Sequence, residues 1–218
     1  MDSYVDNAKT EKPMFIVFEG LDGSGKTTQI KLLASYLREQ MRRVYVTAEP
    51  TQSATGGLIR DTLTGNYKRS ACELAGLFLA DRIAHNVNPV WGIHKFLKEG
   101  MDVISDRYYY SSFAYQGTDK NLKWIIESNL SCPEITRPDL CIFLDLDPAS
   151  CQTRMDSRAV LEIYEGSKAL LKQTRDRFYR VFDQLAHQEN VQIVDAARPQ
   201  EAVAADIRRI VRDWMQAG

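Results

Sequence analysis

The segment at residues 20–27 has the pattern Gly-x-x-x-x-Gly-Lys-Thr, which cradles phosphate groups in many nucleotide-binding proteins. Glycines in such a loop allow backbone N–H groups to turn toward an anion. Lys26 can reach the β- and γ-phosphates, and the Thr27 hydroxyl can ligate Mg²⁺. The candidate triphosphate-binding residues are Gly20, Leu21, Asp22, Gly23, Ser24, Gly25, Lys26, Thr27 and Thr28. The segment therefore predicts chemistry on a nucleoside triphosphate.

Three arginines indicate a second phosphate site. Arg107 follows an apolar run at 102–105, and Arg60 and Arg82 lie in neighbouring helical segments. The planar guanidinium group suits phosphate oxygens. Two unit charges about 5 Å apart repel by roughly 3 kcal/mol at an effective dielectric near 20, so a triphosphate and an acceptor monophosphate need several cations between them. Arginines, Lys26 and Mg²⁺ together predict phosphoryl transfer between two nucleotides.

The segments that carry these residues alternate between strands and helices. Short apolar runs predict five strands, at 14–19, 44–47, 102–105, 140–144 and 191–194. Helical spacing of apolar residues is found at 30–37, 58–63, 71–97, 122–130, 166–187 and 199–216. Pro89 is expected to kink or divide the helix at 71–97, and Asp147 to cap another helix that begins at Pro148. The alternation predicts an α/β fold with three α/β/α layers around a five-stranded parallel sheet, whose ligands gather at the carboxyl ends of the strands.

Composition narrows the range of partners. The chain has 218 residues and a net charge of −1, so no overall basic field favours nucleic acid or an anionic membrane. No apolar run approaches the roughly 20 residues of a membrane helix, and no signal peptide pattern begins the chain. Four scattered cysteines are typical of reduced thiols, and three scattered histidines are expected on the surface or in packing. We expect a mobile tail at 1–12, one domain at 13–218 and a cytoplasmic location.

Other triphosphate-binding classes lack their expected motifs. A GTPase would carry Asn-Lys-x-Asp after a strand, and this sequence has none. A motor or ATPase usually has Asp-Glu at the end of a strand, whereas here Asp145 is followed by Leu146. A nucleotide kinase therefore remains the leading interpretation.

In these residues and the segments around them, the sequence resembles the thymidylate kinase family. The segments that carry the resemblance are 18–29, Glu49-Pro50, 77–82, 106–117 and 138–140. The similarity extends from about residue 14 to the end, and 106–117 is its most specific part, because many families share the phosphate loop. The resemblance implies a P-loop fold of the adenylate kinase type, the reaction ATP + dTMP → ADP + dTDP, a requirement for Mg²⁺ and a homodimer packed through the apolar face of 71–97.

The resemblance also implies roles for individual residues. Phe78 would stack on the thymine ring, Arg82 and Gln116 would bind its polar edge, and Tyr115 would crowd the position of a ribose 2′-hydroxyl. The implied dTMP-binding residues are Glu49, Pro50, Arg60, Phe78, Arg82, Arg107, Ser111, Tyr115 and Gln116. The implied metal site is Thr27 and Asp106, and the implied catalytic residues are Lys26, Arg107 and Arg158.

The segment near 152–165 resembles the mobile lid of this family. One subgroup has a basic residue inside the phosphate loop, and another has arginines in the lid. Gly23 occupies the loop position here, whereas Arg154 and Arg158 lie in the lid segment, as in the bacterial lid-arginine type. Arg158 would reach the transferred phosphoryl group, and Arg154 would bind ATP. Ala48 stands where many relatives have arginine.

Two other functions remain open at this stage. A different nucleoside monophosphate kinase or a deoxynucleoside kinase could use the same scaffold, and the latter would need a base such as Glu19 or Glu49. A regulatory protein that hydrolyses ATP slowly belongs to a different class, and the Asp106-Arg107 segment argues against it.

Overall fold

The computed structural model describes residues 12–155 and 167–217. Strands and helices alternate through these ranges, as the sequence predicts. Their bounds are β1 (Phe15–Glu19), α1 (Lys26–Glu39), β2 (Val44–Ala48), α2 (Ala54–Leu63), α3 (Ala71–Val87), α4 (Ile93–Lys98), β3 (Asp102–Asp106), α5 (Tyr109–Tyr115), α6 (Leu122–Leu130), β4 (Leu140–Asp145), α7 (Pro148–Met155), α8 (Lys168–Leu185), β5 (Val191–Asp195) and α9 (Gln200–Ala217).

The strands form one parallel sheet in the order β2-β3-β1-β4-β5. β1 lies at its centre, where every residue is buried, because helices cover both faces of a parallel sheet. Phe18 on β1 is paired with Asp106 on β3, so the phosphate loop and the Asp106-Arg107 segment leave the sheet side by side. The predicted five-stranded parallel sheet is confirmed.

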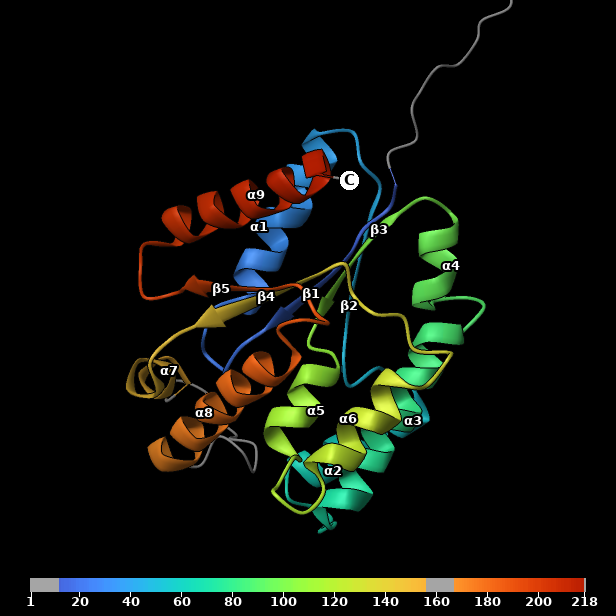
Figure 1. The fold of residues 1–218 in the computed structure, drawn as a ribbon, viewed down its shortest axis with the longest axis vertical. Helices are drawn as coiled ribbons and strands as arrows, with labels where there is room; N and C mark the ends of the chain where they lie inside the picture. The colour runs from blue at the N-terminus through green and yellow to red at the C-terminus, as the bar shows by residue number, and fades with distance from the viewer. Residues whose placement is uncertain (1–11, 156–166, 218) are drawn as a thin grey trace, which may run out of the picture.

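Helices pack on both faces of the sheet and make the three predicted layers (Figure 1). α1 and α9 cover one face, over a core that includes Ile16, Leu33 and Ile207. α5 and α8 cover the other face, over a core that includes Phe143 and Phe178. α2, α3 and α6 lie together beyond α5, on the side of β2 and β3 (Figure 1). No helix in the two described ranges is both long enough and apolar enough to cross a membrane.

Local signals explain several helix ends. α3 ends at Val87, two residues before Pro89, which cannot donate a backbone hydrogen bond and divides this region as predicted. Asp147 accepts hydrogen bonds from the backbone N–H groups of Ala149 (3.0 Å) and Ser150 (2.9 Å) at the start of α7. Hydrogen bonds to Ser150 and Ala149 lower the pKa of Asp147 to about 2. The predicted cap is confirmed.

Two features differ from the expectations. No helix is predicted between 106 and 122, yet α5 lies there, and all seven of its residues are buried. A helix buried on every side has no polar face, so the amphipathic spacing that identifies surface helices is missing. Residues 152–155 of the expected lid form the last part of α7, and 156–166 lie outside the described residues.

Candidate active site

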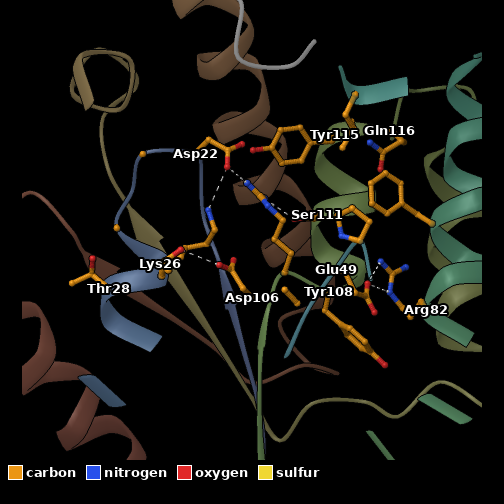
Figure 2. A pocket seen from close by; sticks show the side chains of 18 residues that line it. Asp22, Lys26, Thr28, Glu49, Arg82, Asp106, Tyr108, Ser111, Tyr115 and Gln116 are labelled. Carbon is orange, nitrogen blue, oxygen red and sulfur yellow. Dashed lines mark hydrogen bonds and ion pairs between the residues drawn. The ribbon is translucent and has the colours of Figure 1, made fainter. Parts of the chain in front are cut away.

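A cavity of about 430 Å³ opens at the carboxyl ends of the central strands (Figure 2). In Figure 2 Lys26 and Asp22 lie on one side of it, Arg82 and Gln116 lie on the other, and Asp106 lies between them. The predicted residues among those lining it are Asp22, Gly23, Gly25, Lys26, Thr27, Thr28, Glu49, Pro50, Phe78, Arg82, Asp106, Arg107, Ser111, Tyr115 and Gln116. One space therefore joins the phosphate loop to the residues expected to bind an acceptor.

The phosphate loop wraps the first turn of α1. Gly23 and Gly25 have φ angles of 81° and 96°, which glycine adopts without steric cost. A Cβ atom at Gly23 would lie 2.6 Å from the carbonyl oxygen of Cys151, so a larger residue there would displace α7. The loop thus presents the N-terminus of α1, with its partial positive charge, to the cavity.

Lys26 is almost fully buried at the base of this loop. Its Nζ donates hydrogen bonds to the carbonyl oxygens of Gly20 and Leu21, both at 3.0 Å, and lies 3.9 Å from Asp22 Oδ1. Burial lowers the pKa of Lys26, and the positive charge of Arg107 lowers it further. The ammonium group is held at the cavity wall, where it can meet an anionic ligand.

Thr27 and Asp106 bring two oxygen atoms together at the same wall. Thr27 Oγ1 donates a hydrogen bond to Asp106 Oδ2 at 3.4 Å. Mg²⁺ is commonly held by one or two protein oxygens, the rest of its coordination coming from water and substrate phosphates. No cluster of three His, Cys, Asp or Glu side chains that could hold a metal by itself occurs within 12–155 and 167–217. The donor set present here fits Mg²⁺ delivered with a triphosphate.

Arg107 follows β3 with a φ angle of 70°, in the left-handed region that a residue with a side chain rarely adopts. Its Nη2 lies 2.6 Å from Asp22 Oδ1, and its Nη1 donates to Ser111 Oγ at 2.9 Å. The guanidinium carbon lies 5.2 Å from the centre of the Tyr115 ring. Burial alone would lower the pKa of Arg107, but the surrounding groups, Asp22 most strongly, together outweigh burial and raise the pKa, so the side chain stays charged.

Glu19, the last residue of β1, holds the segment that follows Arg107. Its carboxylate is fully buried and accepts hydrogen bonds from the backbone N–H groups of Tyr108 (2.9 Å) and Ser111 (3.0 Å). Ser111 Oγ also donates to it at 2.7 Å. Burial raises the pKa of Glu19, although Arg107 and these hydrogen bonds oppose the change. The carboxylate therefore anchors the start of α5 and the Ser111 side chain.

The far end of the cavity is built on a buried ion pair. Arg82 is 1% exposed, and its Nη2 lies 2.7 Å from Glu49 Oε2. Arg82 Nη1 donates to Asn129 Oδ1 at 2.6 Å and Nη2 to Ser112 Oγ at 3.2 Å. Phe78 and Gln116 line the cavity next to this group. A flat aromatic face beside fixed polar groups is suited to a nucleobase.

His85 belongs to this group, although its position was not singled out. Its Nδ1 lies 3.0 Å from Glu49 Oε1, and its Nε2 lies 2.8 Å from Thr47 Oγ1. The expectation of a surface or packing role is incomplete, because the fully buried ring bridges Glu49 of the site and Thr47 of β2. The available signal was its position three residues after Arg82, which places both side chains on one helix face.

Some predicted residues do not line the cavity. Arg60 Nη1 donates to the carbonyl oxygens of Thr51 (2.6 Å) and Pro50 (3.3 Å). Arg154 Nη1 reaches the Gly23 carbonyl oxygen at 3.3 Å. Other predicted residues absent from the lining are Gly20, Leu21 and Ser24. Arg158 lies outside the described residues. The lining also includes Ala48, Leu63 and Tyr108, which were not predicted.

Comparison with known proteins points to one family. The family model for thymidylate kinase matches residues 18–207. The chain is 38% identical to the probable thymidylate kinase of Pyrococcus horikoshii over 204 residues, which cover 91% of this chain and 95% of that protein. It is 37% identical to the probable thymidylate kinase of Caldivirga maquilingensis over 202 residues, covering 92% and 94%. It is 36% identical to the thymidylate kinase of Clavibacter michiganensis over 210 residues, covering 94% and 97%.

The family match spans the phosphate loop, the Asp106-Arg107 segment and the helices that bound the cavity. These are the same elements that join a triphosphate site to an acceptor site in the geometry above. The chain belongs to the thymidylate kinase family, whose members phosphorylate dTMP to dTDP with ATP as the phosphate donor.

Proposed function

We propose that this chain transfers the γ-phosphoryl group of ATP to dTMP, releasing ADP and dTDP. The observation that carries the proposal is one cavity with Lys26 of the phosphate loop on one side and Arg82 on the other (Figure 2). Phe78, which also lines this cavity, precedes Arg82 by four residues on α3. Two nucleotides bound at these ends meet with their phosphates near Asp106 and Arg107. This arrangement suits direct transfer between them.

At the donor end, the backbone of the phosphate loop and Lys26 bind the β- and γ-phosphates of ATP. Thr27 and Asp106 would hold Mg²⁺, which would neutralise charge on the phosphates. Lys26 already donates to two carbonyl oxygens of the loop, so the position of its ammonium group is set before substrate arrives. Arg154, which reaches the loop at Gly23, contributes to the binding of ATP.

At the acceptor end, Arg107 binds the phosphate of dTMP with support from Ser111. We assign Arg60 to the same phosphate from the family resemblance, although its side chain does not line the cavity here. Phe78 stacks on thymine while Arg82 and Gln116 bind its polar edge. Tyr115, held over the guanidinium group of Arg107, fills the space of a 2′-hydroxyl and favours deoxyribose. Glu49 acts through Arg82, because both of its carboxylate oxygens already have partners.

The chemical step needs no general base, because the phosphate oxygen of the acceptor is already anionic near neutral pH. The protein has to align that oxygen with the γ-phosphorus atom and offset the repulsion between the two anions. Arg107 bridges the two ends through its ion pair with Asp22 of the phosphate loop. From the sequence we assign Arg158 to the transferred phosphoryl group, within a lid near 152–165 of the single domain 13–218.

The test is release of ADP, coupled to an optical readout, with dTMP, dUMP, dCMP, dGMP, AMP and thymidine as acceptors. We expect the highest kcat/KM with dTMP and little turnover with thymidine. Discrimination against dUMP is expected to be the weakest in this panel, because the methyl group that distinguishes dTMP from dUMP contributes only about 1–3 kcal/mol. Fastest turnover with AMP or dCMP would overturn the dTMP assignment, and ADP release that ignores every acceptor would indicate an ATPase.

We also propose that the chain forms a homodimer in the cytoplasm. Support comes from the family resemblance and from apolar side chains near the end of α3: Val87 is 41% exposed and Val90 is 70% exposed. Multi-angle light scattering is expected to give twice the mass of the chain, and Val90→Asp to shift the mass toward that of a monomer. A monomeric mass for the unaltered chain at micromolar concentration would refute the dimer.

A further inference from the structure

The turn between β2 and α2 connects several parts of the acceptor end. It begins with Glu49 and Pro50 in the cavity lining and leads into α2, which carries Arg60. α2 is tied to this turn, because Arg60 Nη1 donates to the Thr51 carbonyl oxygen at 2.6 Å. A Cβ atom at Gly56 would lie only 1.9 Å from the same oxygen, so turn and helix are in close contact. A shift of Thr51 must therefore move α2 or Arg60.

Asp81 on α3 is the buried carboxylate that holds this turn. Asp81 is fully buried, and its Oδ2 accepts a hydrogen bond from the Thr51 backbone N–H at 2.7 Å. Its Oδ1 accepts from the hydroxyl groups of Thr51 (2.6 Å), Ser53 (2.7 Å) and Thr55 (2.9 Å). Four donors from alternate residues of one short segment thus converge on a single side chain.

The next residue of α3, Arg82, holds the other end of the same turn through Glu49. Two successive residues of one helix therefore fix the turn at both ends, with opposite charges. This pairing explains how Pro50 stays at the cavity wall while the chain reverses direction from an edge strand into α2. Asp81 itself does not line the cavity.

We propose that Asp81 is a positioning residue for the acceptor nucleotide, acting through the turn at 51–55 to place Pro50 and Arg60. The proposal rests on the proposed function, because it takes this end of the cavity as the dTMP site. Burial alone would raise the pKa of Asp81, but the hydrogen bonds from Thr51, Ser53 and Thr55 outweigh it and lower the pKa. The charged form, which only accepts hydrogen bonds, is thus the one that fits the four donors.

The test compares Asp81→Asn with the matched variant Asp61→Asn, which makes the same charge change at an exposed position of α2. Asp81→Asn is expected to raise the KM for dTMP about tenfold to a hundredfold, because it loosens the residues that hold the acceptor. The KM for ATP is expected to stay within about twofold, since the phosphate loop is a separate element. Asp61→Asn is expected to resemble the unaltered enzyme in both constants.

Hydrogen exchange supplies a readout that does not depend on activity. Asp81→Asn is expected to speed exchange of the Thr51 amide, because it weakens the hydrogen bond of that amide to residue 81, whereas Asp61→Asn is expected to leave this exchange unchanged.

An unaltered KM for dTMP in folded Asp81→Asn, or an equal rise in the KM for both substrates, overturns the proposal. The unaltered enzyme is assayed first with the full panel of acceptors. Absence of turnover with dTMP contradicts the proposed function, and the same KM comparison is then made with its best acceptor.

A second variant covers the case in which Asp81→Asn does not fold. Thr55→Val keeps the shape of the side chain and removes one of the four donors. It is expected to raise the KM for dTMP about threefold, with the KM for ATP unchanged. Where both single variants fold, the double variant is expected to be no worse than Asp81→Asn alone, because the two residues act through one contact. Full additivity, or a Thr55→Val enzyme with unaltered constants, would count against Asp81.

Discussion

Lys26→Ala is expected to abolish phosphoryl transfer while dTMP binding stays measurable. Lys26 places one positive charge between the loop and the incoming triphosphate, in a buried position where electrostatic interactions are strong. Its removal also leaves the carbonyl oxygens of Gly20 and Leu21 without their ammonium donor. We expect kcat to fall at least about a thousandfold, equivalent to roughly 4 kcal/mol of lost stabilisation of the transition state.

Single-turnover kinetics with saturating ATP and calorimetric titration with dTMP measure the two effects separately. Lys31→Ala is the matched control, since Lys31 is an exposed lysine later in the same helix. It is expected to retain the kcat of the unaltered enzyme. If Lys26→Ala instead kept its kcat and showed only a higher KM for ATP, the lysine would bind the ground state and not the transition state.

Replacement of Arg107 is expected to lower the kcat/KM for dTMP about a thousandfold. This guanidinium group joins the two ends of the cavity, because it pairs with Asp22 in the phosphate loop and with Ser111 beside the acceptor. Without it, the loop carboxylate of Asp22 would face the acceptor phosphate with one less cation nearby, and the repulsion between the anions would grow. Both binding of dTMP and the transfer step should therefore weaken.

The backbone of Arg107 provides an internal control. Because its φ angle is 70°, Arg107→Gly relieves steric strain that Arg107→Ala keeps, while both variants lack the charge. Both are expected to lose activity equally, and the glycine variant is expected to be more stable in thermal unfolding by about 1 kcal/mol. Activity in Arg107→Gly near that of the unaltered enzyme would show that the turn matters and the guanidinium group does not.

Most of the fold could be predicted from sequence because its signals are local. An apolar run such as 140–144 is a buried strand wherever the chain places it, and Asp147 before Pro148 is a cap for reasons contained in three residues. α5 could not be predicted in this way, because tertiary contacts bury every one of its residues. Its beginning depends on Glu19, which is ninety residues earlier in the chain and accepts hydrogen bonds from the backbone N–H groups of Tyr108 and Ser111.

In the candidate site, too, local motifs could be predicted and tertiary contacts could not. The phosphate loop is a continuous motif, and Arg82 and Arg107, which the sequence predicts as part of a second phosphate site, line the same cavity in the structure. The partners of these residues were not predicted, because they are selected by packing between separate elements. His85 and Asp81 gain their contacts only when α3 packs against the turn after β2. The roles assigned to the site residues remain predictions for the variants described above.

The order of the strands separates two tasks within one enzyme. The phosphate loop extends from β1, Arg107 follows the neighbouring strand β3, and the turn that carries Glu49 follows β2, one strand farther away. The part of the protein that would distinguish one nucleobase from another is thus at the margin of the sheet, and the reacting groups are at its centre. Selection could remodel the margin, including the alanine at position 48, and obtain a new preference among acceptors while the geometry of the reacting atoms is inherited intact.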